Sequence, residues 1–279
     1  MNSLFCFGFG YTAEHLAPSL PAGWQIGGTV RHKNGRPGIQ LFGEALDLSH
    51  ITHLLISIPP EEAGDPVLLR YRHALEAAND LRWIGYLSTT GVYGDHNGAL
   101  VDETTPLAPT SERSRRRAAA ERDWLDFGVQ QDVPVRIFRL AGIYGPGRNA
   151  LEDLKDGTAK RIVRPGQLFS RIHVEDIAQT LLASLAASGE SAIFNVCDDE
   201  PAPPAEVVAY AADLLGVEPP PEIPFEQAAL SPMALTFWAD NKRVDNRLMK
   251  EELGVSLRYP TYREGLRALF SATTPSAAS

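Results

Sequence analysis

The chain has 279 residues, of which 44% are hydrophobic and 22% are charged, as is ordinary for a globular protein with a large core. Its formal net charge of -9 argues against a general binder of nucleic acids or other polyanions. The two cysteines, Cys6 and Cys197, have no metal-ligand spacing, so we expect buried thiols in a reduced, cytoplasmic compartment. The apolar N-terminal run is too short for a signal peptide, and no stretch approaches the length of a membrane span.

Strand-like apolar runs alternate with helical patterns over most of the chain. We expect strands at residues 4–7, 24–30, 39–42, 54–58, 83–88, 135–140 and 193–196. Helical patterns lie between them at residues 66–80, 111–128 and 174–187. This alternation is typical of an α/β protein with a parallel sheet. From Asp198 onward, proline-rich punctuation around short helices indicates a second lobe.

The first strand runs directly into a glycine-rich turn and an amphipathic helix. In this turn Gly8 allows a sharp bend, Gly10 lets the backbone approach a pyrophosphate, and Ala13 packs closely on the strand. The spacing Gly-x-Gly-x-x-Ala, with Tyr11 inside it, predicts dinucleotide binding at residues 8–13. The alternative is an ordinary glycine-rich turn between a strand and a helix.

The end of the second strand indicates which dinucleotide is bound. An acid that would hydrogen-bond the ribose of NAD is absent there, and the strand runs into Arg31-His32-Lys33. A guanidinium offers forked donors to a 2′-phosphate, whereas a carboxylate would repel it. We therefore predict NADP(H) in preference to NAD(H), with Arg31 as the discriminating residue. The alternative is a solvated basic loop.

Four further segments carry a family resemblance. They read LSTTGVYG at residues 87–94, RLAGIYGPGR at 139–148, RIHVED at 171–176 and FNVCD at 194–198. In this order they resemble the extended short-chain dehydrogenase/reductases, the nucleotide-sugar epimerase/dehydratase group, over residues 3–269. The resemblance implies a Rossmann-type doubly wound parallel sheet with a small C-terminal α/β lobe and substrate between them. We place the Rossmann domain at residues 1–144 and 171–198, the lobe at 145–170 and 199–270, and a flexible tail at 271–279.

The chain departs from this family at the catalytic motif Tyr-x-x-x-Lys. Counting back from Glu121 puts Arg117 at the lysine place and Arg113 at the tyrosine place, and no tyrosine lies between Tyr93 and Tyr144. Arginine cannot replace the tyrosine as acid/base, because its guanidinium stays protonated. Arg117 could still contact the cofactor ribose, and Arg113 could polarise a carbonyl or hold an anion. The alternative is that both belong to a solvated arginine-rich helix face.

Other site residues follow from the same resemblance. Thr89 falls where the family carries a catalytic Ser or Thr, with Thr90 beside it as a substrate contact. Tyr93 is a substitute proton donor or else a packed aromatic residue. The remaining assignments are Ser57 to the cofactor, Asp47 at the end of the third strand to the adenine amine, and Arg148 and Lys242 to the substrate. The alternatives are a helix-capping surface arginine at 148 and a solvated helix start at 241–243.

We expect no metal site. His173 and Asp176 open the helix 174–187 and have no third ligand at useful spacing, so we interpret both as structural. Asp176 suits the positive N-terminus of that helix, and His173 packs between the lobes.

Two functions remain open from the sequence. The first is an NADP(H)-dependent oxidoreductase or epimerase-like enzyme with altered acid/base chemistry, acting on a small sugar-like or nucleotide-linked compound. The second is a catalytically inactive NADP(H)-binding redox sensor or partner-binding protein. Thr89 favours the first, and the loss of Tyr-x-x-x-Lys favours the second. Because related proteins dimerise through the helix that is arginine-rich here, we expect a monomer or a weak homodimer.

Overall fold

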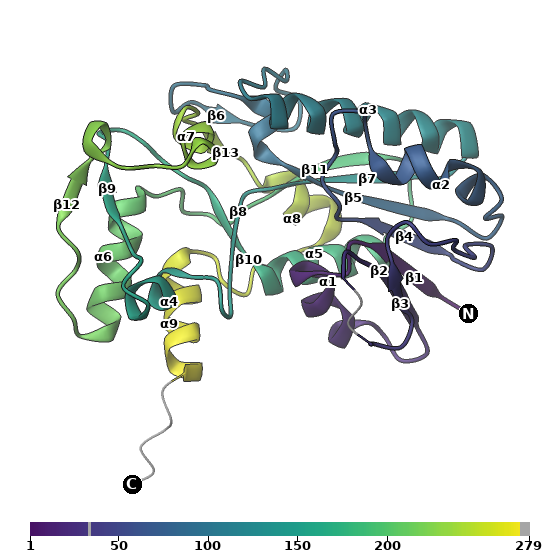
Figure 1. Cartoon of the computed structure of the whole chain (residues 1–279), viewed down its shortest axis with the longest axis horizontal. Helices are drawn as coiled ribbons and strands as arrows, with labels where there is room; N and C mark the ends of the chain where they lie inside the picture. The colour runs from purple at the N-terminus through teal and green to yellow at the C-terminus, as the bar shows by residue number, and fades with distance from the viewer. Residues whose placement is uncertain (33–34, 274–279) are drawn as a thin grey trace, which may run out of the picture.

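A seven-stranded parallel sheet forms the centre of the computed structural model, which describes residues 1–32 and 35–273 (Figure 1). The strand order is β11-β7-β5-β4-β1-β2-β3. The strands are β1 (Ser3–Phe7), β2 (Gln25–Val30), β3 (Ile39–Leu41), β4 (His53–Ile56), β5 (Trp83–Thr89), β7 (Val135–Leu140) and β11 (Ala192–Val196). The order reverses at β1, which pairs with β2 on one side and β4 on the other. Ligands of such sheets bind beyond the carboxyl ends of the strands at this reversal.

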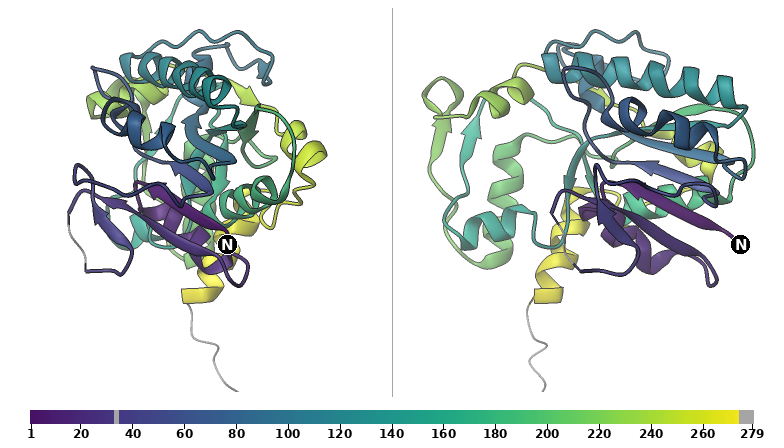
Figure 2. Two further views of the ribbon diagram at one scale, coloured as in Figure 1. Left: turned by 90° about the vertical axis from the view of Figure 1, so that its right-hand side faces the viewer. Right: turned by 45° about the vertical axis from the view of Figure 1, so that its right-hand side comes forward.

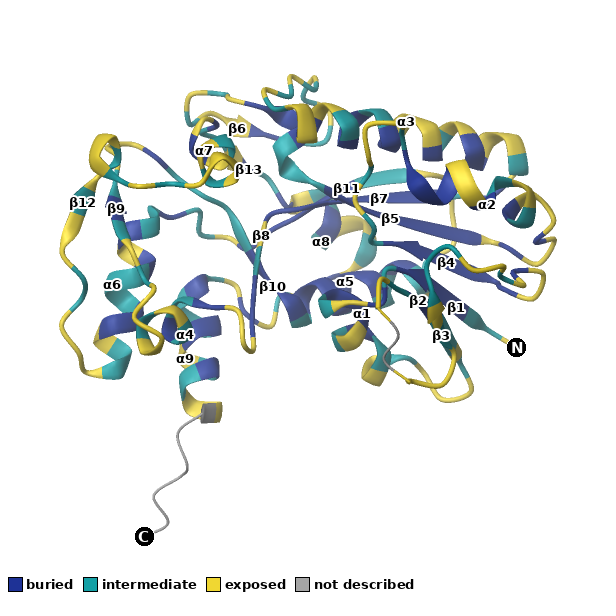
Figure 3. Cartoon of the chain, in the orientation of Figure 1, coloured by how far each residue is buried: buried dark blue, intermediate teal, exposed yellow. Residues whose placement is uncertain are grey.

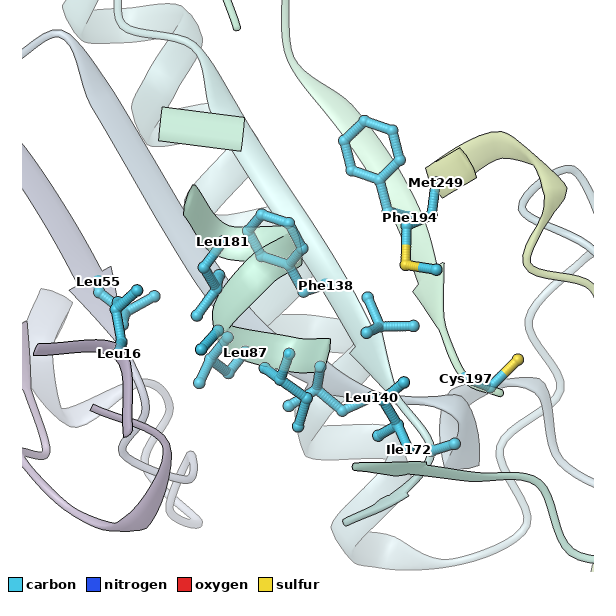
Figure 4. Packing of buried hydrophobic residues seen from close by; sticks show 14 of the residues in the cluster. Leu16, Leu55, Leu87, Phe138, Leu140, Ile172, Leu181, Phe194, Cys197 and Met249 are labelled. Atoms are coloured by element: carbon cyan, nitrogen blue, oxygen red, sulfur yellow. The ribbon is translucent and has the colours of Figure 1, made fainter. Parts of the chain in front are cut away.

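Helices cover both faces of the sheet. One face carries α1 (Tyr11–Leu16), α5 (Val174–Ala186) and α8 (Arg247–Leu253), and the other carries α2 (Pro66–Glu76) and α3 (Glu112–Gln131) (Figure 1). The central strands are almost wholly buried (Figure 3), as expected for parallel strands that are covered on both sides. Figure 4 shows part of one core layer, where Leu181 and Met249 pack near Phe138 and Phe194.

The second lobe stands beside the sheet and has its own small core (Figure 2). Its elements are α4 (Ala150–Lys155), β9 (Arg161–Val163), α6 (Pro204–Leu215), β12 (Glu222–Pro224), α7 (Pro232–Trp238) and α9 (Tyr262–Thr273). The described residues also form three short 3-10 turns, at Ala17–Ser19, Thr90–Tyr93 and Phe225–Gln227. The lobe core contains Leu151, Val207 and Leu266.

Two short parallel pairs lie between the sheet and the lobe. They are β8 (Gly142–Tyr144) with β10 (Arg171–His173), and β6 (Leu100–Val101) with β13 (Arg243–Val244). The chain crosses toward the lobe after β8 and returns at β10. These pairs therefore fix the position of the connections that line the space between the two parts.

The doubly wound sheet and the second lobe agree with the sequence prediction, but two boundaries differ. Val244, Met249 and Val255 pack in the sheet core, so the segment with β13 and α8 lies on the Rossmann domain, although 199–270 was assigned to the lobe. The apolar side chains of this segment pack against the sheet, which brings the chain back from the lobe to the Rossmann domain. Helix α9 ends at Thr273, within the predicted tail 271–279, and residues 274–279 lie outside the described part.

The structure also bears on the cysteines, on membrane-spanning helices and on metal-binding groups. Cys6 and Cys197 are free and buried. Within residues 1–32 and 35–273, no helix combines the length and apolar character needed to span a bilayer. The same residues contain no group of three or more His, Cys, Asp or Glu side chains that could hold a metal ion.

Candidate functional site

The glycine-rich turn lies at the carboxyl end of β1, where the sheet order reverses. Gly8 has φ +90°, and a Cβ there would meet Ile58 Cγ1 at 3.1 Å, so only glycine fits without strain. A Cβ on Gly10, by contrast, would meet no atom within 4 Å. Ala13 is buried in the sheet core. The turn thus leaves open space above Gly10, as close approach of a phosphate requires, and its geometry fits a dinucleotide.

Tyr11 links this turn to the chain segment that crosses toward the second lobe. Its hydroxyl donates to the Pro146 carbonyl oxygen at 3.0 Å. Burial raises the pKa of Tyr11, and the nearby Arg148 charge opposes that rise. Arg148 is exposed and lies two residues after Pro146, so it stands on the cofactor side of the space between the two parts.

The residues predicted to hold the adenosine end of the cofactor are solvent-exposed. Arg31 follows β2 and makes no hydrogen bond or ion pair with a described residue, whereas Lys33 lies outside the described residues. Arg36, which the sequence analysis did not single out, pairs with Glu14 at 2.6 Å. Asp47 was placed at the end of the third strand, but β3 ends at Leu41.

The position of Asp47 corrects the predicted strand end. The chain turns after Leu41, and Asp47 lies in a loop where it accepts hydrogen bonds from the Ser49 amide at 3.0 Å and hydroxyl at 2.6 Å. These bonds lower the pKa of Asp47. Its carboxylate is therefore engaged in a local turn.

A cleft of about 540 Å³ separates the carboxyl edge of the sheet from the second lobe. Seven of the predicted site residues line it, namely Ser57, Thr89, Thr90, Arg113, Arg117, Arg148 and Lys242. Thr12 from the glycine-rich turn also lines it, and Leu168, Phe169 and Phe237 face it from the connections and α7. The fold thus joins the dinucleotide turn, the Thr89 loop and the arginine helix in one space.

Thr89 ends β5 and begins the following 3-10 turn. Its Oγ1 accepts a hydrogen bond from the Gly91 amide at 3.1 Å, which leaves the hydroxyl hydrogen available to a ligand. Thr89 and Thr90 are half-buried and both line the cleft. This is the placement that the resemblance implies for a hydroxyl that holds a substrate oxygen.

Arg113 and Arg117 lie one turn apart on α3 but differ in their surroundings. Arg117 is buried, and its Nη1 donates to the Leu87 carbonyl at 2.6 Å. Its buried Nε has no hydrogen-bond partner among the described residues. Arg113 is exposed, and its guanidinium carbon lies 5.3 Å from the centroid of the Phe237 ring on α7.

The solvated arginine face that the sequence left open is therefore present only in part. Arg115 and Arg116 pair with Glu112 at 3.1 and 3.2 Å and lie outside the cleft. Glu121 pairs with Arg139, not with an arginine of α3. Helical periodicity explains the split, since positions 113 and 117 share the face that meets the sheet edge.

Tyr93 is fully buried and does not line the cleft, which corrects its candidacy as a proton donor. Its hydroxyl donates to Asn195 Oδ1 at 2.8 Å and accepts from Arg139 Nη1 at 2.9 Å. Burial raises the pKa of Tyr93 to about 12, against the lowering effect of Arg139. The aromatic packing interpretation fits this environment.

Lys242 enters the cleft as half of a buried pair that the sequence did not reveal. Its Nζ donates to the Gly94 carbonyl at 2.8 Å and lies 3.3 Å from Asp240 Oδ2. The Asp240 carboxylate also accepts from the Thr110 hydroxyl at 2.6 Å. Burial lowers the pKa of Lys242, and Asp240 opposes the shift. Only the short spacing of Asp240 and Lys242 could have indicated this pair.

His173 and Asp176 are both buried in structural positions, as predicted, but the side chain that caps α5 is His173, and Asp176 instead holds the segment at residues 258–259. His173 Nδ1 accepts from the Glu175 amide at 3.2 Å, and its ring lies 4.2 Å from that of Tyr259. The Asp176 carboxylate accepts from the amides of Arg258 and Tyr259 at 2.6 and 3.1 Å. Burial raises the pKa of Asp176, and these amides oppose the rise.

Comparison with known proteins identifies relatives that match most of the chain. Protein YeeZ of Escherichia coli K12 is 31% identical, and the match covers 93% of this chain and 97% of YeeZ. A 3-diazoavenalumate denitrifying reductase from a Streptomyces species is 29% identical over 76% of this chain and 75% of that enzyme.

Solved structures share the fold over nearly the whole chain. A functionally unknown conserved protein from Silicibacter pomeroyi is 51% identical, with a TM-score of 0.91 over 98% of this chain and all of that one. MoeE5, solved with UDP-glucuronic acid and NAD, is 21% identical, with a TM-score of 0.78 over 98% of this chain and 99% of MoeE5. The model of the NAD-dependent epimerase/dehydratase family matches residues 68–197. The chain belongs to this family of extended short-chain dehydrogenase/reductases.

Proposed function

We propose that this protein is an NADP(H)-dependent reductase that acts on a small anionic substrate. One observation carries the proposal: the cleft unites Ser57, from the cofactor end of the sheet, with the Thr89 hydroxyl and the Arg113 guanidinium. The reductase from Streptomyces supports the reaction type, because its name describes a reduction. The open space above Gly10 supports binding of a dinucleotide.

Residues of three elements would hold the cofactor. The turn at Gly8 and Gly10 would receive the pyrophosphate, Arg31 would receive the 2′-phosphate, and the Arg117 guanidinium, whose Nε lacks a partner among the described residues, would donate to the nicotinamide ribose. Bound NADPH supplies a hydride to an electrophilic carbon of the substrate. Thr89 holds the substrate oxygen through its available hydroxyl hydrogen.

We assign the proton in this reaction to water, because α3 carries no tyrosine at the usual place and the hydroxyl of Tyr144, which also lines the cleft, donates to the Thr261 carbonyl at 3.5 Å. Arg113 stays protonated at neutral pH, so it binds negative charge and does not act as a base. The Tyr93 hydroxyl is engaged by Asn195 and Arg139. When a carbonyl is reduced, its carbon takes the hydride and its oxygen takes a proton from water, which gives an alcohol.

Cofactor binding and turnover test this function separately. Calorimetry measures the affinities for NADPH and NADH, and loss of NADPH absorbance measures turnover of ketones, aldehydes, aromatic acids and nucleotide sugars. The reductase is supported if the wild type turns over a substrate and the Thr89→Val variant does not, although that variant still binds NADPH. Absence of NADPH binding contradicts it.

The loss of Tyr-x-x-x-Lys and the burial of Tyr93 favour a second candidate, a cofactor-binding sensor without catalysis. A sensor would bind NADP(H) tightly and turn over no member of the substrate panel. Thr89→Val would then bind the cofactor as well as the wild type.

A further inference from the structure

We propose that the substrate is a singly charged aromatic carboxylate, held between Arg113 and the aromatic side chains Phe237 and Phe169. This inference rests on the proposed function and specifies its substrate class. Phe237 is 48% exposed although it is a large apolar residue, and it lines the cleft beside Arg113. An exposed aromatic ring at the edge of a cleft offers a surface for a flat apolar ligand.

The charges of the cleft indicate a single anionic group at this end. Lys242 is paired with Asp240, and Arg171 donates to the carbonyls of Phe169 and Ala202 at 2.8 and 3.1 Å. Arg113 makes no hydrogen bond or ion pair with any described residue. One available cation matches one carboxylate.

A nucleotide diphosphate fits this end poorly. It brings at least two negative charges, whereas Arg113 is the cation at this end that no carboxylate or carbonyl of a described residue engages. Arg117 and Arg171 also line the cleft without an ion pair among the described residues, but they donate to backbone carbonyls. Arg148 lies on the cofactor side, two residues after Pro146, whose carbonyl the Tyr11 hydroxyl contacts. The charges therefore favour a monoanion beside Phe237.

The size and lining of the cleft favour a small flat molecule. A volume of about 540 Å³ has to receive the nicotinamide end of the cofactor as well as the substrate. The wall opposite the sheet carries Leu168, Phe169 and Phe237. Sugar hydroxyls against such a wall would lose hydrogen bonds to water, whereas an aromatic ring would bury apolar surface.

Aromatic neighbours hold Phe169 in place. Phe169 packs edge-on against Trp238 at 5.3 Å, and Trp238 is stacked on Phe225 at 5.2 Å. Arg113 can stack on a ring and pair with a carboxylate, because its guanidinium is planar and presents forked donors. The expected ligand thus places its ring on Phe237 and Phe169 and its carboxylate on Arg113.

Calorimetry with four probes tests the proposal, with and without saturating NADP⁺. The probes are trans-cinnamate, cinnamyl alcohol with the same ring but no charge, sorbate with the charge but no ring, and UDP-glucuronic acid. We expect cinnamate to bind at least about tenfold more tightly than each of the others, since a charge-assisted contact and ring packing each contribute on this scale. Tighter binding of UDP-glucuronic acid, or no binding of cinnamate, overturns the proposal.

Variants assign the binding to the two side chains. Arg113→Gln should remove the preference for cinnamate over cinnamyl alcohol, and Phe237→Leu should reduce its preference over sorbate. Arg115→Gln is the matched control, because Arg115 lies on the same helix but pairs with Glu112 outside the cleft. Cinnamate selectivity that survives Arg113→Gln contradicts the proposal. Cinnamate binding without NADP(H) binding would retain the subsite and reject the reductase.

Discussion

Glu121 on α3 and Arg139 on β7 form a buried ion pair, with 2.7 Å between Glu121 Oε2 and Arg139 Nη2, and both side chains are only 3% exposed. The Ser88 hydroxyl also donates to Glu121, and Arg139 extends the network to the Tyr93 hydroxyl. This buried pair connects α3 to the sheet directly beneath the cleft, which Ser88 also lines. The orientation of the arginine helix therefore depends on it.

We expect Glu121→Gln to destabilise the protein by about 3–5 kcal/mol, because it leaves the Arg139 charge buried without a counterion. Urea unfolding measures the loss. Replacing both residues, as Glu121→Leu with Arg139→Met, should cost less than the sum of the single changes. Glu112→Gln, on the exposed face of the same helix, is the control and should leave the midpoint nearly unchanged. Equal effects of the two glutamate substitutions would contradict the role of burial.

Arg31→Ala should remove most of the preference for NADP(H) over NAD(H). A charge-assisted phosphate contact corresponds to about one to two decades in affinity. Calorimetry with both cofactors measures the ratio of affinities. Arg72→Ala is a matched control, since Arg72 pairs with Glu76 on α2 and does not line the cleft. A wild-type protein that binds both cofactors equally rules out this role for Arg31.

We expect Thr89→Val to affect turnover and Tyr93→Phe to affect stability. The first removes the hydroxyl from the cleft, so turnover falls while NADPH affinity is retained. The second removes a buried hydroxyl with two partners, so stability falls by about 1–3 kcal/mol while turnover continues. Steady-state kinetics and urea unfolding of both variants separate the two effects. Loss of turnover in Tyr93→Phe at unchanged stability would restore Tyr93 as proton donor.

We expect the protein to become less stable as the pH rises, because the buried Asp198 carboxyl is protonated in the folded state. Burial raises the pKa of this carboxyl to about 8, although the Arg171 charge opposes the rise, and its Oδ2 has no hydrogen-bond partner among the described residues. The folded state therefore holds a proton that the unfolded state releases near pH 4, and its stability declines between about pH 4 and pH 8. Asp198→Asn should flatten this decline. Urea unfolding at pH 5, 7 and 9 checks it, and parallel profiles for both proteins would exclude Asp198 as the cause.

The oligomeric state remains a prediction, and we expect a monomer or a weak homodimer. Helix α3 carries Arg115 and Arg116 on its exposed face with Glu112 as their partner. Two copies meeting there would bring these arginines together, at a cost that salt reduces. Light scattering at low and high ionic strength measures the mass. A tight dimer through α3 at low salt would refute the expectation.

The sequence by itself determined the strands of the central sheet and the long helices between them, but not the short strands β6, β8, β9, β10, β12 and β13. Apolar periodicity is a local property, so the strands 135–140 and 83–88 and the helix that begins at Val174 were predicted to within a few residues. The turn at Gly8 and the place of Thr89 at the end of β5 also follow from short segments, because each depends on the conformation of adjacent residues.

Tertiary packing alone decided the surroundings of the site residues. Arg113 reaches Phe237 across 124 positions of sequence, and Tyr93 meets Asn195 across 102. The apolar periodicity of the sequence does not indicate such pairs, because they form only when distant segments pack together. The resemblance implied different contacts for Arg117 and Arg113, but only the fold shows that Arg117 is buried and Arg113 exposed where both line the cleft.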